Sequence, residues 1–167
     1  MPASEIERGF LRTLASLVPG ASGYRDAASR RGTDRQIRDH IIDELDRLRG
    51  KLAELKALAE EEGEEDMLDD LARVDSRMER TAGALQAGGH EETPFFTQDQ
   101  VPEAQLDRAC AHDQALLQDL DLLSRDVMGM KYETIGNLTL REVEGTLAAI
   151  ELKVTNRKDV FERSGGD

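Results

Sequence analysis

Apolar residues recur at helical spacing in four stretches of this 167-residue chain. Steps of three or four residues place side chains on one face of a helix and form a seam that another helix can cover. The seam positions are Ile41, Leu45, Leu48, Leu52, Leu55; Met67, Leu71, Val74, Met78, Leu85; Leu106, Cys110, Asp113, Leu117, Leu120, Val127; and Leu140, Val143, Leu147, Ile150, Val154, Arg157, Phe161. Four such seams predict an all-α fold in which helix packs on helix.

Turn signals between the seams predict two antiparallel helical hairpins. The helices are expected at about 33–62, 65–86, 102–127 and 139–163. Gly63, in an acidic run, suits a left-handed helix cap, and the loop at 128–138 contains further glycines. Because short connections make consecutive helices antiparallel, we expect hairpins over 33–87 and 102–163. Together they are expected to form a four-helix bundle or coiled coil.

A separate amphipathic helix is predicted ahead of the hairpins. Ser4 followed by Glu7 is typical of a capping box. One face of this helix carries Ile6, Phe10, Leu14 and Leu17. This face has three possible partners, in our order of preference: the chain's own bundle, the groove of a protein partner, or a membrane surface touched by residues 4–18. The predicted organisation is an N-terminal helix at 1–18, a flexible linker at 19–32, a helical bundle at 33–163 and a disordered tail at 164–167.

Composition narrows the range of partners. The net charge is −13, and 34% of the residues are charged. Such a surface repels phosphate backbones at long range, so no nucleic acid partner is expected, and basic or apolar partners are favoured. Cys110 is the only cysteine, which indicates a reducing compartment. Because the start of the chain has no secretory signal and no apolar run approaches the length of a membrane span, we expect a cytoplasmic protein.

Two charged residues interrupt the apolar seams. Asp113 lies between Cys110 and Leu117, and Arg157 interrupts the last seam. Counted from the loop at 128–138, the two lie at similar heights on antiparallel helices. A buried carboxylate needs a partner, so an ion pair between Asp113 and Arg157 is predicted. Such a pair either sets helix register or forms part of a polar site, and the structural role is the preferred interpretation.

Signals for metal or nucleophilic chemistry are weak. Di-metal bundles use Glu-x-x-His pairs, and no histidine here has Glu three residues before it. His112 adjoins Asp113, but consecutive side chains are expected to diverge on a helix. The chain has no nucleophile elbow and no phosphate-binding glycine loop. Cys110 lies on a seam and is interpreted as a small buried hydrophobe. We therefore expect no cofactor, no metal and no enzymatic activity.

The aromatic pair Phe95-Phe96 lies in a loop between the hairpins, next to Pro94. Exposed aromatic residues of this kind mark contact surfaces. The alternative is that they close the end of the bundle. We expect one of the two to do so and leave the other open, so both are candidate partner-contact residues.

The chain loosely resembles uncharacterised bacterial all-helical coiled-coil proteins. The motifs that carry this resemblance are Pro19-Gly20-Ala21-Ser22-Gly23-Tyr24, Arg30-Arg31 with Asp34, Phe95-Phe96, Leu106-Asp107, and Asp113 before Leu116-Leu117. The resemblance implies an all-helical fold and brings no activity with it.

The excess of packing signals over catalytic ones favours a protein that acts by binding. We expect a non-enzymatic adaptor or assembly protein, with a protein partner or a second copy of itself as the ligand, and long seams favour a homo-oligomer. Two alternatives stay open. One is a peripheral membrane or envelope-stress protein anchored by the N-terminal helix, and the other is a metal-binding helical bundle.

Overall fold

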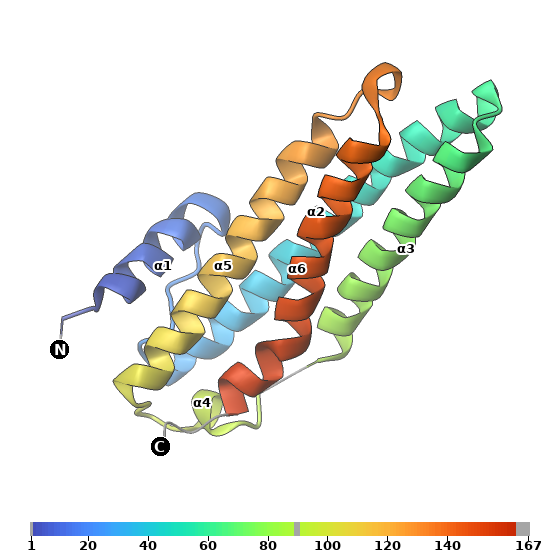
Figure 1. Ribbon diagram of the computed structural model, residues 1–167. Helices are drawn as coiled ribbons and strands as arrows, with labels where there is room; N and C mark the ends of the chain where they lie inside the picture. The colour runs from blue at the N-terminus through green and yellow to red at the C-terminus, as the bar shows by residue number, and fades with distance from the viewer. Residues whose placement is uncertain (1, 89–90, 163–167) are drawn as a thin grey trace.

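The computed structural model describes residues 2–88 and 91–162, and within these ranges it is all-helical, with no strand (Figure 1). The elements are α1 (Glu5–Leu17), α2 (Ala27–Glu62), α3 (Glu65–Ala87), α4 (Pro94–Thr97), α5 (Glu103–Met128), the 3-10 helix η1 (Tyr132–Thr134) and α6 (Asn137–Glu162). The tail predicted at 164–167 lies outside the described residues. None of the described helices is both long and apolar enough to cross a membrane.

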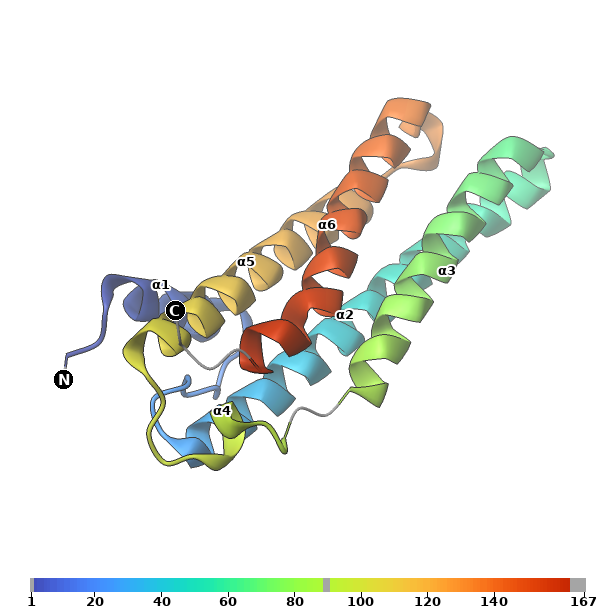
Figure 2. The same cartoon turned by 60° about the horizontal axis from the view of Figure 1, so that its bottom comes forward.

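The predicted seams form one shared apolar core. α2 packs on α3, α5 on α6, α2 on α5, and α3 on α6. Every seam residue is buried except Met67 and Val154, which are partly buried and pack against the same core. α1 lies along the outer side of α5, and α4 lies across one end of the helices (Figures 1 and 2). Helix-on-helix packing therefore accounts for the interior.

The N-terminal helix α1 docks on its own chain, the first of the three expected arrangements. The Ser4 side chain accepts a hydrogen bond from the Glu7 amide at 3.0 Å, which is one of the two hydrogen bonds of the predicted capping box. Phe10 and Leu14 are fully buried, and Leu17 packs against the core, whereas Ile6 remains exposed. The alternatives in which Phe10 and Leu14 contact a protein partner or a membrane are therefore wrong, because both side chains are buried inside the chain.

The flexible linker predicted at 19–32 is wrong over its second half, because α2 begins at Ala27. Asp26 caps the helix by accepting from the Ser29 amide at 2.9 Å. Thr33, the expected helix start, lies inside the helix. Its hydroxyl accepts from the Gly23 amide and donates to the Gly23 carbonyl, both at 2.9 Å. Gly23 has φ +97°, a left-handed conformation that glycine adopts without strain.

The other boundaries differ by small amounts. α5 starts at Glu103 and ends at Met128, and α6 starts at Asn137, ahead of the expected Thr139. Gly63 has φ 72°, so the predicted left-handed cap of α2 is confirmed.

Candidate functional site

The ion pair predicted between Asp113 and Arg157 is present and fully buried. Arg157 Nε donates to Asp113 Oδ1 at 3.0 Å, and Nη2 donates to Oδ2 at 2.9 Å. This is the bidentate geometry in which a guanidinium matches a carboxylate best. The pair joins α5 to α6 at the height that the sequence predicts.

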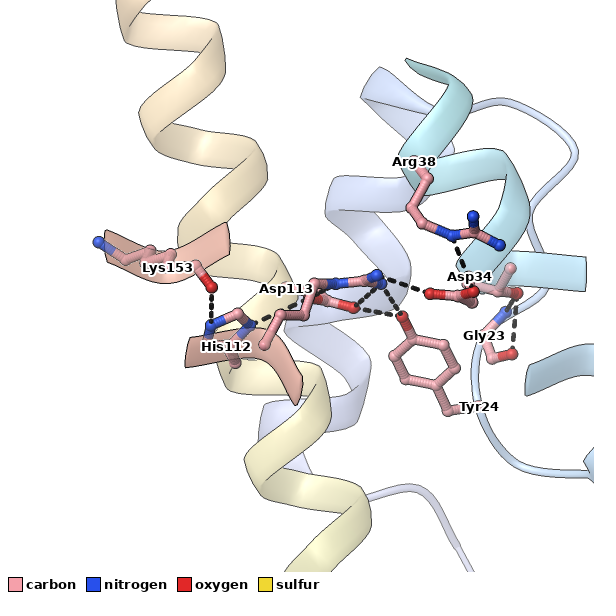
Figure 3. Close-up of polar contacts among 9 residues, drawn as sticks. Gly23, Tyr24, Asp34, Arg38, His112, Asp113 and Lys153 are labelled. Atoms are coloured by element: carbon pink, nitrogen blue, oxygen red, sulfur yellow. Dashed lines mark hydrogen bonds and ion pairs between the residues drawn. The ribbon is translucent and has the colours of Figure 1, made fainter. Parts of the chain in front are cut away.

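The pair belongs to a larger group of buried polar side chains (Figure 3). Arg157 Nη1 donates to Asp34 Oδ1 of α2 at 2.6 Å, and the Tyr24 hydroxyl donates to Asp113 Oδ2. Arg157 Nη2 also lies 3.4 Å from the Tyr24 hydroxyl. We call Tyr24, Asp34, Asp113 and Arg157 the buried ionic cluster. It connects the 18–26 segment, α2, α5 and α6 at one point.

Two further residues support the cluster from its edges. Arg38 Nε donates to the second oxygen of Asp34 at 3.0 Å. His112 Nδ1 lies 3.1 Å from Asp113 Oδ1, and Nε2 lies 3.0 Å from the backbone carbonyl of Lys153. The expectation that His112 diverges from Asp113 is wrong. The reason is that its ring lies between the Asp113 carboxylate and the Lys153 carbonyl of α6.

Electrostatics within the cluster favour the charged forms. Burial acts to raise the pKa of Asp113, but the charge of Arg157 and the hydrogen bonds from His112 and Arg157 outweigh it and hold the pKa well below its usual range. Burial acts to lower the pKa of Arg157, and Asp113, Tyr24 and Asp34 reverse this and raise it. Asp113 and Arg157 therefore stay ionised together in the interior.

Tyr24 stays neutral and joins the cluster to an aromatic group. Burial raises the pKa of Tyr24 well above its ordinary value, and the Asp113 charge adds to this effect. Its ring stacks on Phe10 at 5.1 Å between centroids and meets Phe95 edge-on at 5.4 Å. The guanidinium of Arg157 lies 4.8 Å from the Phe161 ring centroid, a cation–π contact.

Both Phe95 and Phe96 are fully buried, so the closing role expected for one of them is confirmed and extends to the other, and the alternative that they contact a partner is wrong. Each packs on Phe161 at 4.9 Å between centroids. Arg30 holds their backbone in place, with Nε donating to the Phe95 carbonyl at 2.6 Å, and Arg31 donates to the Phe96 carbonyl at 3.0 Å. The aromatic pair therefore closes one end of the helices.

The interior presents a saturated set of polar groups. Within the described part of the chain, no buried side-chain nitrogen or oxygen lacks a hydrogen-bond partner. Over the same residues, no three His, Cys, Asp or Glu side chains are grouped to hold a metal. Cys110 is buried as predicted, and burial raises the pKa of its thiol, with the Glu7 and Asp113 charges adding to the shift. The cluster is therefore suited to fixing helix positions.

The sequence contained a signal for one of the two unpredicted members of the cluster. Asp34 continues the seam of α2 backwards from Ile41 through Ile37 at steps of three and four residues. The expected helix start at Thr33 hid this continuation. Tyr24 lies in a non-helical segment, where no periodicity indicates burial.

Comparison of the chain with protein-family models, with curated proteins and with solved structures finds no match.

Proposed function

We propose that this protein is an adaptor or assembly subunit that works through protein–protein contacts on its outer surface. The observation that carries the proposal is the outer face of α6. Leu138 and Leu152 are 75% and 61% exposed, whereas the opposite face of α6 packs into the core. Leucine side chains on an outward helix face suit a contact with another helix.

The apolar residues of the interior are packed against one another, which leaves the outer surface for binding. Of the candidate contact residues on α1 and at Phe95-Phe96, only Ile6 is exposed, so we place the binding contacts on other surfaces. We infer that the two hairpins close into one four-helix bundle. The ring of neighbours from α2 to α3, α6 and α5 supports this inference, since each helix packs on the next and α5 returns to α2.

We propose that a second copy of the chain covers the outer face of α6. Gly145 and Ala148 are exposed between the two leucines, and nothing lies within 4 Å of the Cβ position of Gly145, so a facing helix has room to approach closely. Arg141 and Asp159 lie on the same face, equally far in sequence from residue 150. In an antiparallel pair each arginine then faces the partner's aspartate, as a two-fold interface requires.

Sedimentation velocity over a range of concentrations tests this proposal. The full chain is expected to dimerise, and Leu152→Ser is expected to weaken the dimer by about ten-fold, equivalent to about 1.4 kcal/mol. The matched control is Leu58→Ser, which changes an exposed leucine on α2 and should leave the dimer intact. A strict monomer, or equal weakening by both variants, would remove the proposed α6 interface.

A further inference from the structure

The last turns of α2 carry a shallow, open hollow on their exposed side, which we call the α2 groove. It is lined by five exposed residues of α2, the apolar pair Ala57 and Leu58 and the acidic residues Glu54, Glu60 and Glu61. Leu58 is 41% exposed, although the neighbouring residues Leu55 and Ala59 are buried. The groove extends over about two helical turns, which matches the footprint of a second helix lying across it.

The carboxylates around the groove have no cationic partners of their own. Among the described residues, no hydrogen bond or ion pair involves the side chain of Glu54, Glu60 or Glu61. The nearby Lys56 is engaged elsewhere, since it bonds Asp75 of α3 at 3.3 Å. The rim is therefore an acidic border without local neutralisation.

Helix electrostatics increase the demand for an external cation. The last turn of α2 contains Glu60 and Glu61 and no basic residue. The C-terminal end of a helix is the negative end of its dipole, so carboxylates there are disfavoured and cations are favoured. A positive side chain from outside would relieve this unfavourable arrangement.

The negative charge of the chain is concentrated at the end of α2 and the start of α3. Residues 54–70 contain nine acidic residues and one lysine, a net charge of −8, so the rest of the chain carries only −5 of the total −13. A field of this sign attracts cationic partners and repels nucleic acid. The groove adds an apolar contact, which a purely electrostatic patch would lack.

We propose that this α2 groove binds a basic amphipathic helix from another protein. Its apolar side would cover Ala57 and Leu58, and its Lys or Arg side chains would meet Glu54, Glu60 and Glu61. This mode, an amphipathic helix in an apolar groove with a charged border, is a general form of peptide recognition. The inference rests on the proposed adaptor role and uses a surface separate from the outer face of α6.

Titration calorimetry with a defined probe tests the inference. The probe is a synthetic 18-residue peptide of leucine and lysine in amphipathic helical order, titrated into the full chain. Its control is a peptide of the same composition, scrambled so that it has no apolar face. The ordered peptide is expected to bind about ten-fold more tightly than the scrambled one, and its affinity should fall as the salt concentration is raised.

Paired variants separate specific binding from general attraction. Glu60→Gln/Glu61→Gln should lower the affinity for the ordered peptide by about ten-fold. Asp39→Asn/Asp43→Asn makes the same charge change at exposed positions of α2 and should lower this affinity by less than about two-fold. The inference is overturned if both pairs weaken binding equally, since the peptide then reads only net charge.

Two single leucine variants test the apolar part of the α2 groove independently of the dimer. Leu58→Ser should lower the affinity for the peptide by several-fold and leave dimerisation unchanged. Leu152→Ser should weaken dimerisation and leave peptide binding unchanged. Unchanged peptide binding in Leu58→Ser overturns the groove even if the α6 interface stands. A self-association lost in Glu60→Gln/Glu61→Gln would assign the groove to a second copy and also overturn the inference.

Discussion

At the scale of single residues, the central interaction is the Asp113–Arg157 pair. Asp113 accepts from two nitrogens of Arg157 and from the Tyr24 hydroxyl, and lies within 3.1 Å of the His112 ring. Removing one partner of a buried pair leaves the other charge without compensation. The cost of losing the carboxylate should therefore greatly exceed the net value of the pair itself.

We predict that Asp113→Asn lowers the free energy of unfolding by about 3–5 kcal/mol at neutral pH. The matched control is Asp119→Asn on the same helix. Asp119 also pairs with α6, through Lys153 at 2.6 Å, but both side chains are partly exposed. That change should cost less than about 1 kcal/mol. Urea unfolding followed by circular dichroism measures both, and equal losses would contradict a special role for the buried pair.

The same variant has a defined pH dependence. The folded pKa of Asp113 lies below its unfolded value of about 3.9, so its stabilisation is complete above about pH 5. It is lost as the pH falls below about 4, towards the folded pKa. The difference between the native chain and Asp113→Asn should therefore be constant from about pH 5 to 8 and should shrink below about pH 4. A gap that widened in acid would show the opposite sign.

At the scale of elements, α1 is a docked helix whose position is reported by the single cysteine. Cys110 is fully buried on α5, the helix that α1 covers, and Glu7 of α1 contributes to the raised pKa of its thiol. A buried thiol with a raised pKa reacts slowly with thiol reagents. Its rate of modification therefore measures how often the surrounding helices open.

We predict that Phe10→Ala increases the rate of Cys110 modification by Ellman's reagent at least about ten-fold, because the substitution leaves a cavity where α1 meets the core. Ile6→Ala on the same helix is the control, since Ile6 is exposed, and its rate should stay near that of the native chain. Similar rates in all three proteins would mean that α1 docking does not protect the thiol.

The elements differ in how far the sequence determines them. The long seams are local patterns. The main helices could therefore be predicted, and so could the placement of Asp113 and Arg157 at similar heights on antiparallel helices. The start of α2 could not be placed correctly, because Thr33 and Asp26 are both acceptable caps and only the Gly23–Thr33 contacts decide between them. The burial of Phe96 depends on Phe161 and Arg31, which are distant in sequence.

At the scale of the whole molecule, the buried ionic cluster ties together segments that are far apart in the chain. Tyr24 precedes α2, Asp34 lies in α2, Asp113 in α5 and Arg157 in α6. Since the polar atoms of this interior are satisfied, we place the proposed contacts on the outer face of α6 and in the α2 groove. The central claim is that the cluster makes these segments one cooperative unit.

Native-state hydrogen exchange of Tyr24→Phe tests this claim most directly. The variant removes only the hydroxyl that bonds Asp113, at a cost of about 1–2 kcal/mol, so the fold should survive. If the cluster couples the segments, the slowest amides of α2, α5 and α6 should all exchange faster by a similar factor, about ten-fold. Faster exchange confined to residues 19–26, with α5 and α6 unchanged, would contradict the claim.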